Sequence, residues 1–519
     1  MNWSSHSART FLQPSSFILH PSPSPFPLPH AGPFGSLPRL CMKILLAASE
    51  VAPFARTGGL GDVLEGMPPA LTARGHEVSV VLPCYRGLRA DARLGARSTG
   101  VRLVIPLGGK RVPCEIFEGQ APNGSQIFLI GCDAYFDRPE LYGENAGDYP
   151  DNAERFIFFS KAVVELARRI LPPPDILHVH DWQTALAPVL ARHLRLPLRT
   201  VLTIHDLAFQ GNFWGVDFGL TNLPGDYFSA RGVEFYGNLN LVKGGIVHAD
   251  ALATVSESYA REIQTPEGGS GLDPVIREHA GKLSGILNGA NYAEWNPATD
   301  ASLPETYQPS NLAGKKACRT ALLKDLGLEA DPRGPVYALV SRLTERKGIE
   351  LLLPLLDRLL ANDVRLVVLG QGETAYEREF AIAMRQHPGR FAYRSGFDLR
   401  LSHLIEAGAD ISLVPSHFEP CGLTAMYSLK YGTLPVARAT GGLHQIVQDY
   451  DPTTDTGSGF LFYEFTPAAL WDAIMRATAY HADAPRWETL MRRAMAVDFS
   501  WAKAVLAYEG VYARALHGR

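Results

Sequence analysis

The stretch SRLTERKG, residues 341–348, carries two cations whose spacing could serve phosphate chemistry. The apolar run that leads into it predicts a buried strand ending near Arg342, and Lys347 stands where the next helix should begin. Preorganised cations stabilise negative charge that grows in a transition state, and removing one such group typically costs about 10²–10³ in rate. A solvated charged turn is the alternative for two cations at this spacing.

A second stretch, residues 407–443, places reactive groups after two short apolar runs that predict strands of a parallel sheet. Glu419 and Cys421 follow the first run, and Gly441 and Gly442 follow the second. In open α/β sheets, ligands bind beyond the carboxyl ends of the strands. We therefore expect a binding site here; the alternative is a tight junction in which Gly and Pro serve geometry alone.

The N-terminal half carries a glycine-rich loop, RTGGLGD at residues 56–62, after a predicted strand at residues 43–48. Glycines let backbone N–H groups approach a ligand closely, and a helix from about Val63 adds its positive end, which favours an anion. Such a loop is a weak signal by itself, because many merely turn the chain.

Histidines and aspartates end two further predicted strands. His178, His180 and Asp181 close one strand in HVHDWQ, and His205 and Asp206 close the next in VLTIHD. His-x-His on a strand directs both rings to one face, but no third ligand is specified, so no metal site is expected. A strand-end histidine beside a pocket can donate to a sugar hydroxyl; the alternative is a satisfied core histidine.

Several strings together resemble those of the bacterial and plant glycogen (starch) synthases, glycosyltransferase family 5. They are SEVAPF and TGGLGDV near the start, TIH before the middle, SRLT-x-x-KG, and FEPCGL followed by YGT-P-V-R-TGGL. The similarity covers about residues 42–512. It implies an α/β chain of the GT-B type, with two Rossmann-like, doubly wound parallel-sheet domains that face a central cleft. It also implies a retaining glucosyltransferase that moves glucose from ADP-glucose to the non-reducing end of an α-1,4-glucan in glycogen biosynthesis, without a cofactor.

The resemblance implies roles for individual residues. Arg342 and Lys347 would hold the leaving phosphates. His205 and Glu419 would hold the glucose, and Asp181 would lie near the acceptor. The residues predicted to bind the substrates are Arg56, Gly58, Gly59, Asp62, Asp206, Asn288, Cys421, Gly422, Leu423, Thr440, Gly441 and Gly442.

Seven positions depart from the family pattern. They are Arg56 for Lys, Gln183 for His, Asp206 for Asn, Asn291 for Asp, Arg346 for Gln, Ala425 for Gln and Gln445 for Asp. Five of these departures keep a second hypothesis open, a glucan-binding or regulatory protein that has lost turnover; they are Arg56, Gln183, Asp206, Asn291 and Gln445. A third is a GT-B glucosyltransferase with another donor or acceptor, because no readable motif separates ADP-glucose from UDP-glucose.

The predicted organisation has two domains and two ends. Residues 42–287 form the N-terminal, acceptor-side domain and residues 288–497 the C-terminal, nucleotide-sugar-side domain. The resemblance implies that a helix at residues 498–519 crosses back and packs on the first domain. Residues 1–41, rich in Pro and Ser and free of acidic residues, are predicted to be disordered and to precede a true start at Met42. An organelle transit peptide is the alternative.

Composition excludes several classes of function. Of 519 residues, 46% are hydrophobic and 20% charged, as in ordinary soluble globular proteins. The net charge of −4 and the absence of a basic run argue against nucleic acid as a partner. No apolar run approaches the roughly 18 residues of a membrane span. Six scattered cysteines without a CxxC pair favour a reducing compartment, the cytoplasm. The oligomeric state is not predicted.

Overall fold

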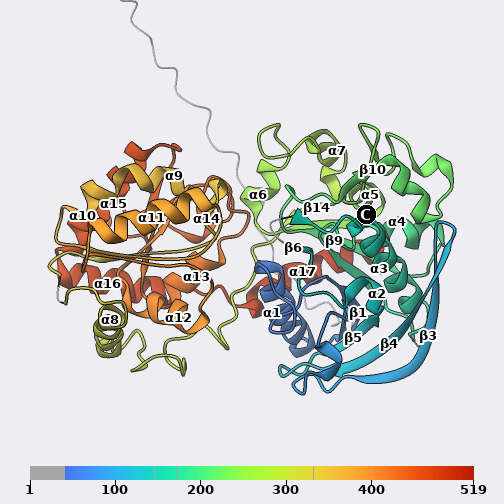
Figure 1. Ribbon diagram of the computed structural model, residues 1–519, viewed down its shortest axis with the longest axis horizontal. Helices are drawn as coiled ribbons and strands as arrows, with labels where there is room; N and C mark the ends of the chain where they lie inside the picture. Colours follow the sequence, from blue (N-terminus) through green and yellow to red (C-terminus); the bar gives the residue numbers. More distant parts are fainter. Residues whose placement is uncertain (1–40, 145–146, 171, 331, 519) are drawn as a thin grey trace, which may run out of the picture. The chain divides into compact units, whose positions relative to one another are not determined.

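Short runs rich in Val, Ile and Leu form two extended sheets, which are drawn as arrows in Figure 1. The computed structural model describes residues 41–144, 147–170, 172–330 and 332–518. The predicted disordered segment therefore lies outside the described residues, except for Cys41. Most of the parallel strands read as apolar runs, because helices cover both faces of the sheets where these strands lie.

The first sheet has the strand order β14-β13-β9-β8-β1-β2-β5-β4-β3. Its strands are β1 (Lys43–Ala47), β2 (Glu77–Pro83), β3 (Arg97–Leu107), β4 (Lys110–Gln120), β5 (Gln126–Gly131), β8 (Ile176–His180), β9 (Arg199–Ile204), β13 (Ala251–Thr254) and β14 (Leu283–Gly285). Neighbours are parallel from β14 to β5, and β4 runs antiparallel to both β3 and β5. The antiparallel hairpin of β3 and β4 forms one edge of this sheet.

The second sheet is parallel throughout, with the order β17-β16-β15-β18-β19-β20. Its strands are β15 (Val336–Val340), β16 (Arg365–Leu369), β17 (Phe391–Arg394), β18 (Ile411–Val414), β19 (Leu434–Arg438) and β20 (Phe460–Phe462). The chain reverses its direction of travel across this sheet between β15 and β18, and across the first sheet between β1 and β8. Such switch points open crevices at the carboxyl ends of the strands, where ligands bind in doubly wound folds.

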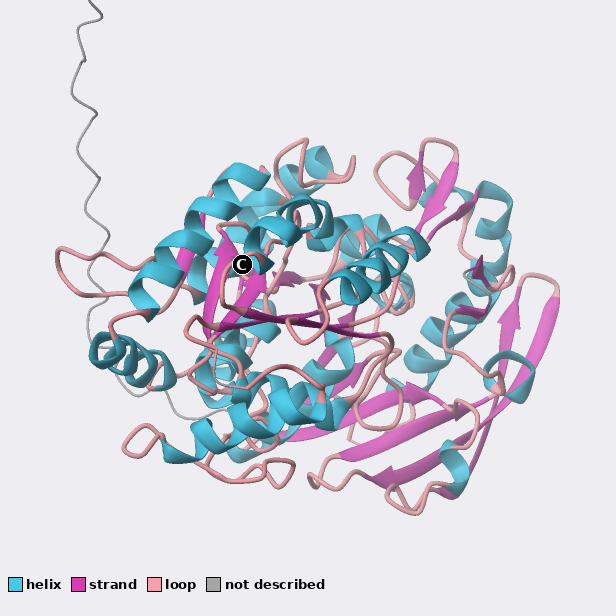
Figure 2. Ribbon diagram, turned by 60° about the vertical axis from the view of Figure 1, so that its left-hand side comes forward, coloured by secondary structure: helices cyan, strands magenta, loops and turns pink. Residues whose placement is uncertain are grey.

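Helices cover both sheets. Those of the first part are α1 (Gly59–Ala73), α2 (Asp133–Phe136), α3 (Asn152–Ala167), α4 (Leu186–His193), α5 (Leu241–His248), α6 (Glu257–Glu262) and α7 (Asp273–Glu278). Those around the second sheet are α8 (Ala313–Asp325), α9 (Ile349–Leu352), α10 (Leu356–Leu360), α11 (Thr374–Gln386), α12 (Leu399–Gly408), α13 (Leu423–Lys430), α14 (Leu443–Ile446), α15 (Pro467–His481) and α16 (Ala484–Met495). Figure 1 shows α9, α11 and α15 on one face of the second sheet and α12, α13 and α16 on the other. Figure 2 shows the same layering, with helices in cyan and strands in magenta.

Two small sheets lie in the first part of the chain, outside the large sheet. They are β6 (Gly143–Glu144) with β7 (Gly147–Asp148), and β10 (Asn212–Trp214), β11 (Glu234–Phe235) and β12 (Asn238–Asn240) in a three-stranded sheet.

The last helix, α17 (Trp501–His517), packs against α1, β9 and β13. Its Trp501 lies so close to Gly66 and Gly289 that a Cβ at either glycine would fall 2.2 Å or 2.5 Å from a Trp501 atom. The Tyr512 hydroxyl lies 2.9 Å from Nδ1 of His178 on β8. Buried aromatic residues thus attach α17 to the first sheet, where the resemblance places it. The exact domain boundaries stay predictions.

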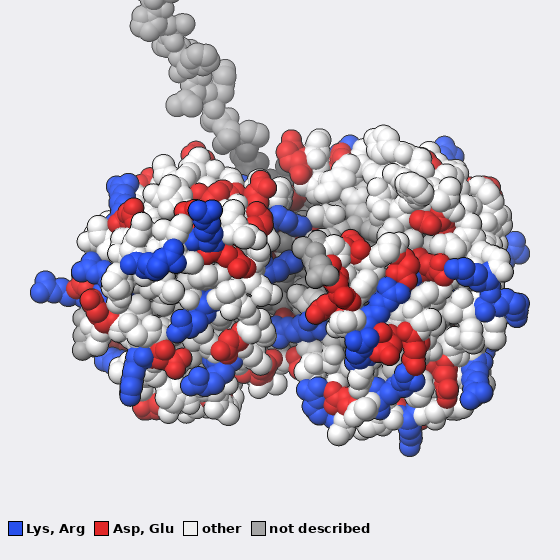
Figure 3. All heavy atoms as spheres, viewed as in Figure 1, with Lys and Arg blue, Asp and Glu red and all other residues white. Residues whose placement is uncertain are grey.

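Charged side chains of both signs cover the described surface shown in Figure 3. On the face shown in Figure 3, Lys and Arg side chains alternate with Asp and Glu, and neither sign dominates. Within the described ranges, no helix combines the length and apolarity needed to cross a bilayer. All six cysteines lie in those ranges and none forms a disulfide.

Candidate active site

The glycine-rich loop after β1 is shaped by a buried carboxylate that the sequence analysis missed. Glu50 accepts hydrogen bonds from the Thr57 N–H at 2.7 Å, the Thr57 hydroxyl at 2.7 Å and the Gly58 N–H at 3.2 Å. The Tyr142 hydroxyl donates to the same carboxylate at 2.8 Å. Helix α1 therefore starts at Gly59, four residues before the predicted start. The signal was the position of Glu50 directly beyond a strand.

Arg56 and Asp62 form a two-pronged ion pair beside this loop. Arg56 Nε lies 3.0 Å from Asp62 Oδ1, and Nη2 lies 3.1 Å from Oδ2. Burial raises the pKa of Asp62 to about 7, and the Arg56 charge opposes this rise. The Arg56 guanidinium also lies 5.5 Å from the centre of the Phe397 ring. A planar fork at this position is thus accommodated by both a carboxylate and an aromatic face.

The glycine-rich loop meets the start of α13. A Cβ at Gly59 would lie 3.4 Å from Leu423 Cδ1, which follows Gly422 at the start of that helix. Two predicted substrate-binding stretches from the two sheets are therefore neighbours.

The ends of β8 and β9 bring Asp181 and His205 together. Asp181 has a φ of 56°, and its Oδ1 accepts a hydrogen bond from the His205 N–H at 2.7 Å. Burial raises the pKa of Asp181 to about 8. Burial lowers the pKa of His205 to about 3, so its imidazole is neutral. A neutral acid and a neutral imidazole can donate hydrogen bonds to sugar hydroxyls without carrying charge.

The two histidines of β8 lie on one face, as their spacing predicts, and form a row with His205. The rings of His178 and His180 are 4.2 Å apart, and His180 Nδ1 lies 3.0 Å from His205 Nε2. His178 Nε2 lies 2.7 Å from the Thr203 hydroxyl. His180 is thus the residue that orients His205. Among the described residues, no cluster of three or more His, Cys, Asp or Glu side chains suits a metal ion.

Lys347 and Glu419, two predicted catalytic residues beside the second sheet, contact each other directly. Lys347 Nζ lies 2.6 Å from Glu419 Oε2, and the Ser416 hydroxyl donates to the same oxygen at 2.9 Å. Lys347 ends a 3-10 turn, and Gly348 after it has a φ of 68°. A phosphate that entered here would compete with Glu419 for Lys347.

Arg342 follows β15 and is exposed. In the described ranges, its guanidinium has no hydrogen-bond or ion-pair partner. An unpaired guanidinium at the carboxyl end of a strand suits a bidentate contact to phosphate.

Asn288 lies behind the loop that carries Cys421. Both residues are buried, and the proximity of Asn288 partly opposes the rise that burial causes in the Cys421 pKa. Burial raises the pKa of Cys421 to about 12, so the thiol stays protonated and serves packing, not nucleophilic attack. Asn288 Oδ1 is one of the buried acceptors without a partner in the described part of the chain.

The backbone N–H groups of the two glycines after β19 donate hydrogen bonds to other parts of the protein. The Gly442 N–H donates to the carbonyls of Glu419 and Pro420 at 3.0 Å and 3.2 Å. The Gly441 N–H donates to Glu262 Oε1 at 2.7 Å. Both glycines are predicted to bind substrate; in the structure their N–H groups donate to protein acceptors, and Thr440 is buried beside them. Glu262 is a further residue that the sequence analysis missed.

Another departure from the family pattern also has a structural role. Gln445 Oε1 accepts hydrogen bonds from the N–H groups of Glu257 at 2.8 Å and Ser258 at 3.3 Å, at the start of α6. The Ser256 hydroxyl donates to the Pro420 carbonyl at 2.8 Å. Helix α6 is therefore bound to the loops of the second sheet.

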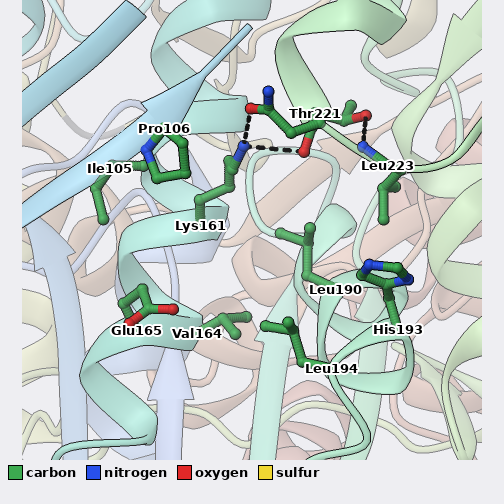
Figure 4. A pocket seen from close by; sticks show the side chains of 11 residues that line it. Ile105, Pro106, Lys161, Val164, Glu165, Leu190, His193, Leu194, Thr221 and Leu223 are labelled. Carbon is green, nitrogen blue, oxygen red and sulfur yellow. Dashed lines mark hydrogen bonds between the residues drawn. The ribbon is translucent and has the colours of Figure 1, made fainter.

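A separate pocket of about 170 Å³ lies between β3, α3 and α4 (Figure 4). Lys161 points into this region and donates to the Thr221 carbonyl at 2.9 Å and to Asn222 Oδ1 at 2.7 Å. Burial lowers the pKa of Lys161 to about 8. Because its ammonium is fully partnered by the protein, Lys161 has a structural role.

Replacing Asp181 with Asn is expected to remove the alkaline fall of activity. The raised pKa keeps the carboxyl neutral below pH of about 8, and ionisation above it places a buried charge beside His205. Wild-type kcat/KM should therefore fall as pH rises through about 8, whereas Asp181→Asn, which stays neutral, should be flat there. The stability that the raised pKa contributes is fully present below the ordinary value of 3.8 and is lost as pH rises through about 8. A variant that kept the wild-type alkaline limb would assign that limb to another group.

Two family models match the chain. One, described as the starch synthase catalytic domain, matches residues 43–278, and one, described as glycosyl transferases group 1, matches residues 327–487. These matches cover the first sheet except for β14, and the whole of the second sheet.

Whole-chain comparisons agree with the family models. The glycogen synthase of Anaeromyxobacter sp. (strain Fw109-5) is 46% identical over 478 residues, 91% of this chain and 99% of that protein. The glycogen synthase of Koribacter versatilis (strain Ellin345) is 44% identical over 481 residues, 91% of this chain and 98% of that protein. The catalytic domain of starch synthase IV from Arabidopsis thaliana, bound to ADP and acarbose, has a TM-score of 0.86 at 33% identity, covering 92% of this chain and 100% of that one. The predicted resemblance and the predicted GT-B fold class are confirmed.

Proposed function

The chain belongs to the glycogen and starch synthase family, and from this premise we propose that it transfers glucose from ADP-glucose to the non-reducing 4-hydroxyl of an α-1,4-glucan with retention of configuration. The observation that carries the proposal is the convergence of two sets of residues. Arg342 and the Lys347–Glu419 pair follow strands of the second sheet, and Asp181 and His205 follow strands of the first. Contacts from α6 and the glycine-rich loop join the two sets.

The residues beside the two sheets have different roles in the proposed reaction. As the bond from glucose C1 to the diphosphate breaks, negative charge grows on the departing ADP, and Arg342 and Lys347 stabilise it. The glucan hydroxyl attacks C1 from the face that the leaving group vacates, and its proton passes to the departing phosphate oxygen. Glu419 and His205 hold the glucose during this exchange.

The buried partners of His205 keep its side of the site uncharged. Asp181 lies near the acceptor in this proposal and remains a neutral acid below pH of about 8. The low pKa of His205 leaves its imidazole neutral, so neither group attracts the departing phosphates away from the cations. Closure of the two domains on the substrates would exclude water and so limit hydrolysis of the donor.

Partnered departures favour an active enzyme over a glucan-binding protein without turnover. Arg56 has Asp62 as its partner, and Gln445 caps the start of α6. Arg56 and Gln445 thus have partners in the folded chain, and the chain keeps the two cations, Arg342 and Lys347, that the proposed transfer needs. We also propose the cytoplasm as the compartment, supported by six free cysteines.

Donor choice and product configuration test the proposal. Protein starting at Met42 is incubated with glycogen and either ADP-glucose or UDP-glucose, and the added residues are examined by proton NMR. We expect faster extension with ADP-glucose and α-linked products that a 1,4-specific amylase removes. Products with β linkages would overturn retention. Glycogen binding without extension from either donor would instead support the binding-protein hypothesis.

A further inference from the structure

Two charged residues stand next in sequence to two predicted catalytic residues and contact each other. Asp206 follows His205 at the end of β9, and Arg346 precedes Lys347 in the loop after β15. Arg346 Nη2 lies 2.9 Å from Asp206 Oδ2 and 3.0 Å from Oδ1. This ion pair links the loop that carries Lys347 to the strand end that carries His205.

Arg346 is held in place from several sides. Its guanidinium lies 5.9 Å from the ring centres of both Phe209 and Phe418, which come from different sheets' loops. Its backbone carbonyl accepts hydrogen bonds from the N–H groups of His417 at 2.9 Å and Phe418 at 3.3 Å. Arg346 therefore also fixes the start of the loop that leads to Glu419.

Asp206 is equally constrained. Its Oδ1 also accepts a hydrogen bond from the Ala208 N–H at 3.1 Å, so both carboxylate oxygens face protein donors. The next residue, Leu207, donates its N–H to the Tyr259 hydroxyl at 2.9 Å. Asp206 is predicted to bind substrate; in the structure both oxygens of its carboxylate contact Arg346, and Oδ1 also accepts from the Ala208 N–H of its own turn.

We propose that Asp206 and Arg346 act as a positioning pair that aligns His205 with Lys347 when the two domains enclose the donor. The proposal rests on the proposed function and deepens it. Asn and Gln at these positions could not form the ion pair, so the two departures from the family pattern act as one coupled change. The pair touches no reacting atom; it sets the distance between the groups that hold the sugar and the groups that hold the phosphates.

The surroundings of the pair make its coupling measurable. The side chains of Arg346 and Asp206 are 34% and 23% exposed, so the pair is partly shielded from solvent and from salt. Residues in direct ionic contact typically show interaction effects of several-fold to a hundredfold in double-mutant cycles. Removing one partner leaves the other charge unpaired beside the site, whereas removing both leaves no such charge.

The test is a double-mutant cycle of Asp206→Asn, Arg346→Gln and the double variant. We expect kcat/KM for ADP-glucose to fall about tenfold in each single variant and to return to within about threefold of wild type in the double variant. The losses should shrink at high salt, because screening weakens the wild-type pair as well. The same non-additivity should appear in ADP affinity measured by calorimetry, because Lys347 is misplaced in each single variant.

A matched control separates positioning from folding. Arg74 and Glu509 form an ion pair of similar exposure, 29% and 23%, between α1 and α17. Arg74→Gln and Glu509→Gln should lower the melting temperature without changing kcat/KM.

A double Asp206/Arg346 variant no better than the worse single variant would overturn the positioning pair and return Asp206 to a direct substrate contact. Activity losses that simply track melting temperature would also overturn it. A third outcome would separate the two proposals. If ADP affinity is non-additive across the four proteins of the cycle but the wild type transfers no glucose, the proposed function is refuted and the positioning pair stands.

Discussion

Replacing Lys347 with Ala is expected to lower kcat by about 10²–10³ while the protein stays folded. The ammonium lies 2.6 Å from Glu419 at the carboxyl edge of the second sheet, where the account places the departing diphosphate. Its removal takes away a preorganised charge and leaves the Glu419 carboxylate, which is 14% exposed, without its cation. The residual anion would then repel the phosphates, so the loss should lie toward the upper end of that range.

Steady-state kinetics and thermal melting check this expectation together. Lys316 on α8 is exposed and provides the control, since Lys316→Ala makes the same change in charge away from both strand ends. We expect Lys316→Ala to match wild type. A Lys347→Ala variant with kcat within threefold of wild type would show that the phosphates are held elsewhere.

Replacing Gly442 with Ala is expected to lower kcat about a hundredfold and to destabilise the protein by about 1–3 kcal/mol. A Cβ at this position would lie 1.8 Å from the Cys421 carbonyl oxygen, a contact that backbone must move to relieve. The Gly442 N–H donates to the Glu419 carbonyl, so that movement would carry Glu419 away from Lys347. Both activity and stability should therefore fall.

A second glycine separates these effects from the loss of glycine itself. Gly281 has nothing within 4 Å of its Cβ position and no left-handed φ, so Gly281→Ala should preserve activity and melting temperature. The Gly442→Ala variant would contradict the structure if its melting curve and kcat both matched those of Gly281→Ala.

The elements of the fold could be predicted well from local pattern. Apolar runs such as residues 43–48 and 409–415 are buried strands, because a parallel sheet covered on both faces needs unbroken hydrophobicity. Arg342, Glu419 and Asp181 lie beyond strands that flank the switch points, where doubly wound sheets bind ligands. The start of α1 was placed four residues late because glycines there obscure the helical period.

The partners of the site residues could not be predicted, because they come from distant parts of the chain. Asp206 pairs with Arg346, 140 positions away, and the Gly441 N–H is occupied by Glu262, 179 positions away. A sequence shows that a glycine or a charge follows a strand, but it does not show which acceptor or counter-ion the fold delivers. Glu50 was missed for a different reason: the N–H groups of Thr57 and Gly58 that it accepts from are close in sequence, but the loop must fold back to bring them to its carboxylate.

The most direct measurement of the central claim follows ADP release and glucose incorporation into glycogen in the same reaction mixture, for wild type and Arg342→Ala. We expect one ADP released for each glucose added in the wild type, and a loss of about 10²–10³ in both rates in the variant. ADP release without glucan extension would mean hydrolysis and not transfer. Equal rates in the two proteins would contradict the assignment of Arg342 to the leaving phosphates and, with it, the site described for this chain.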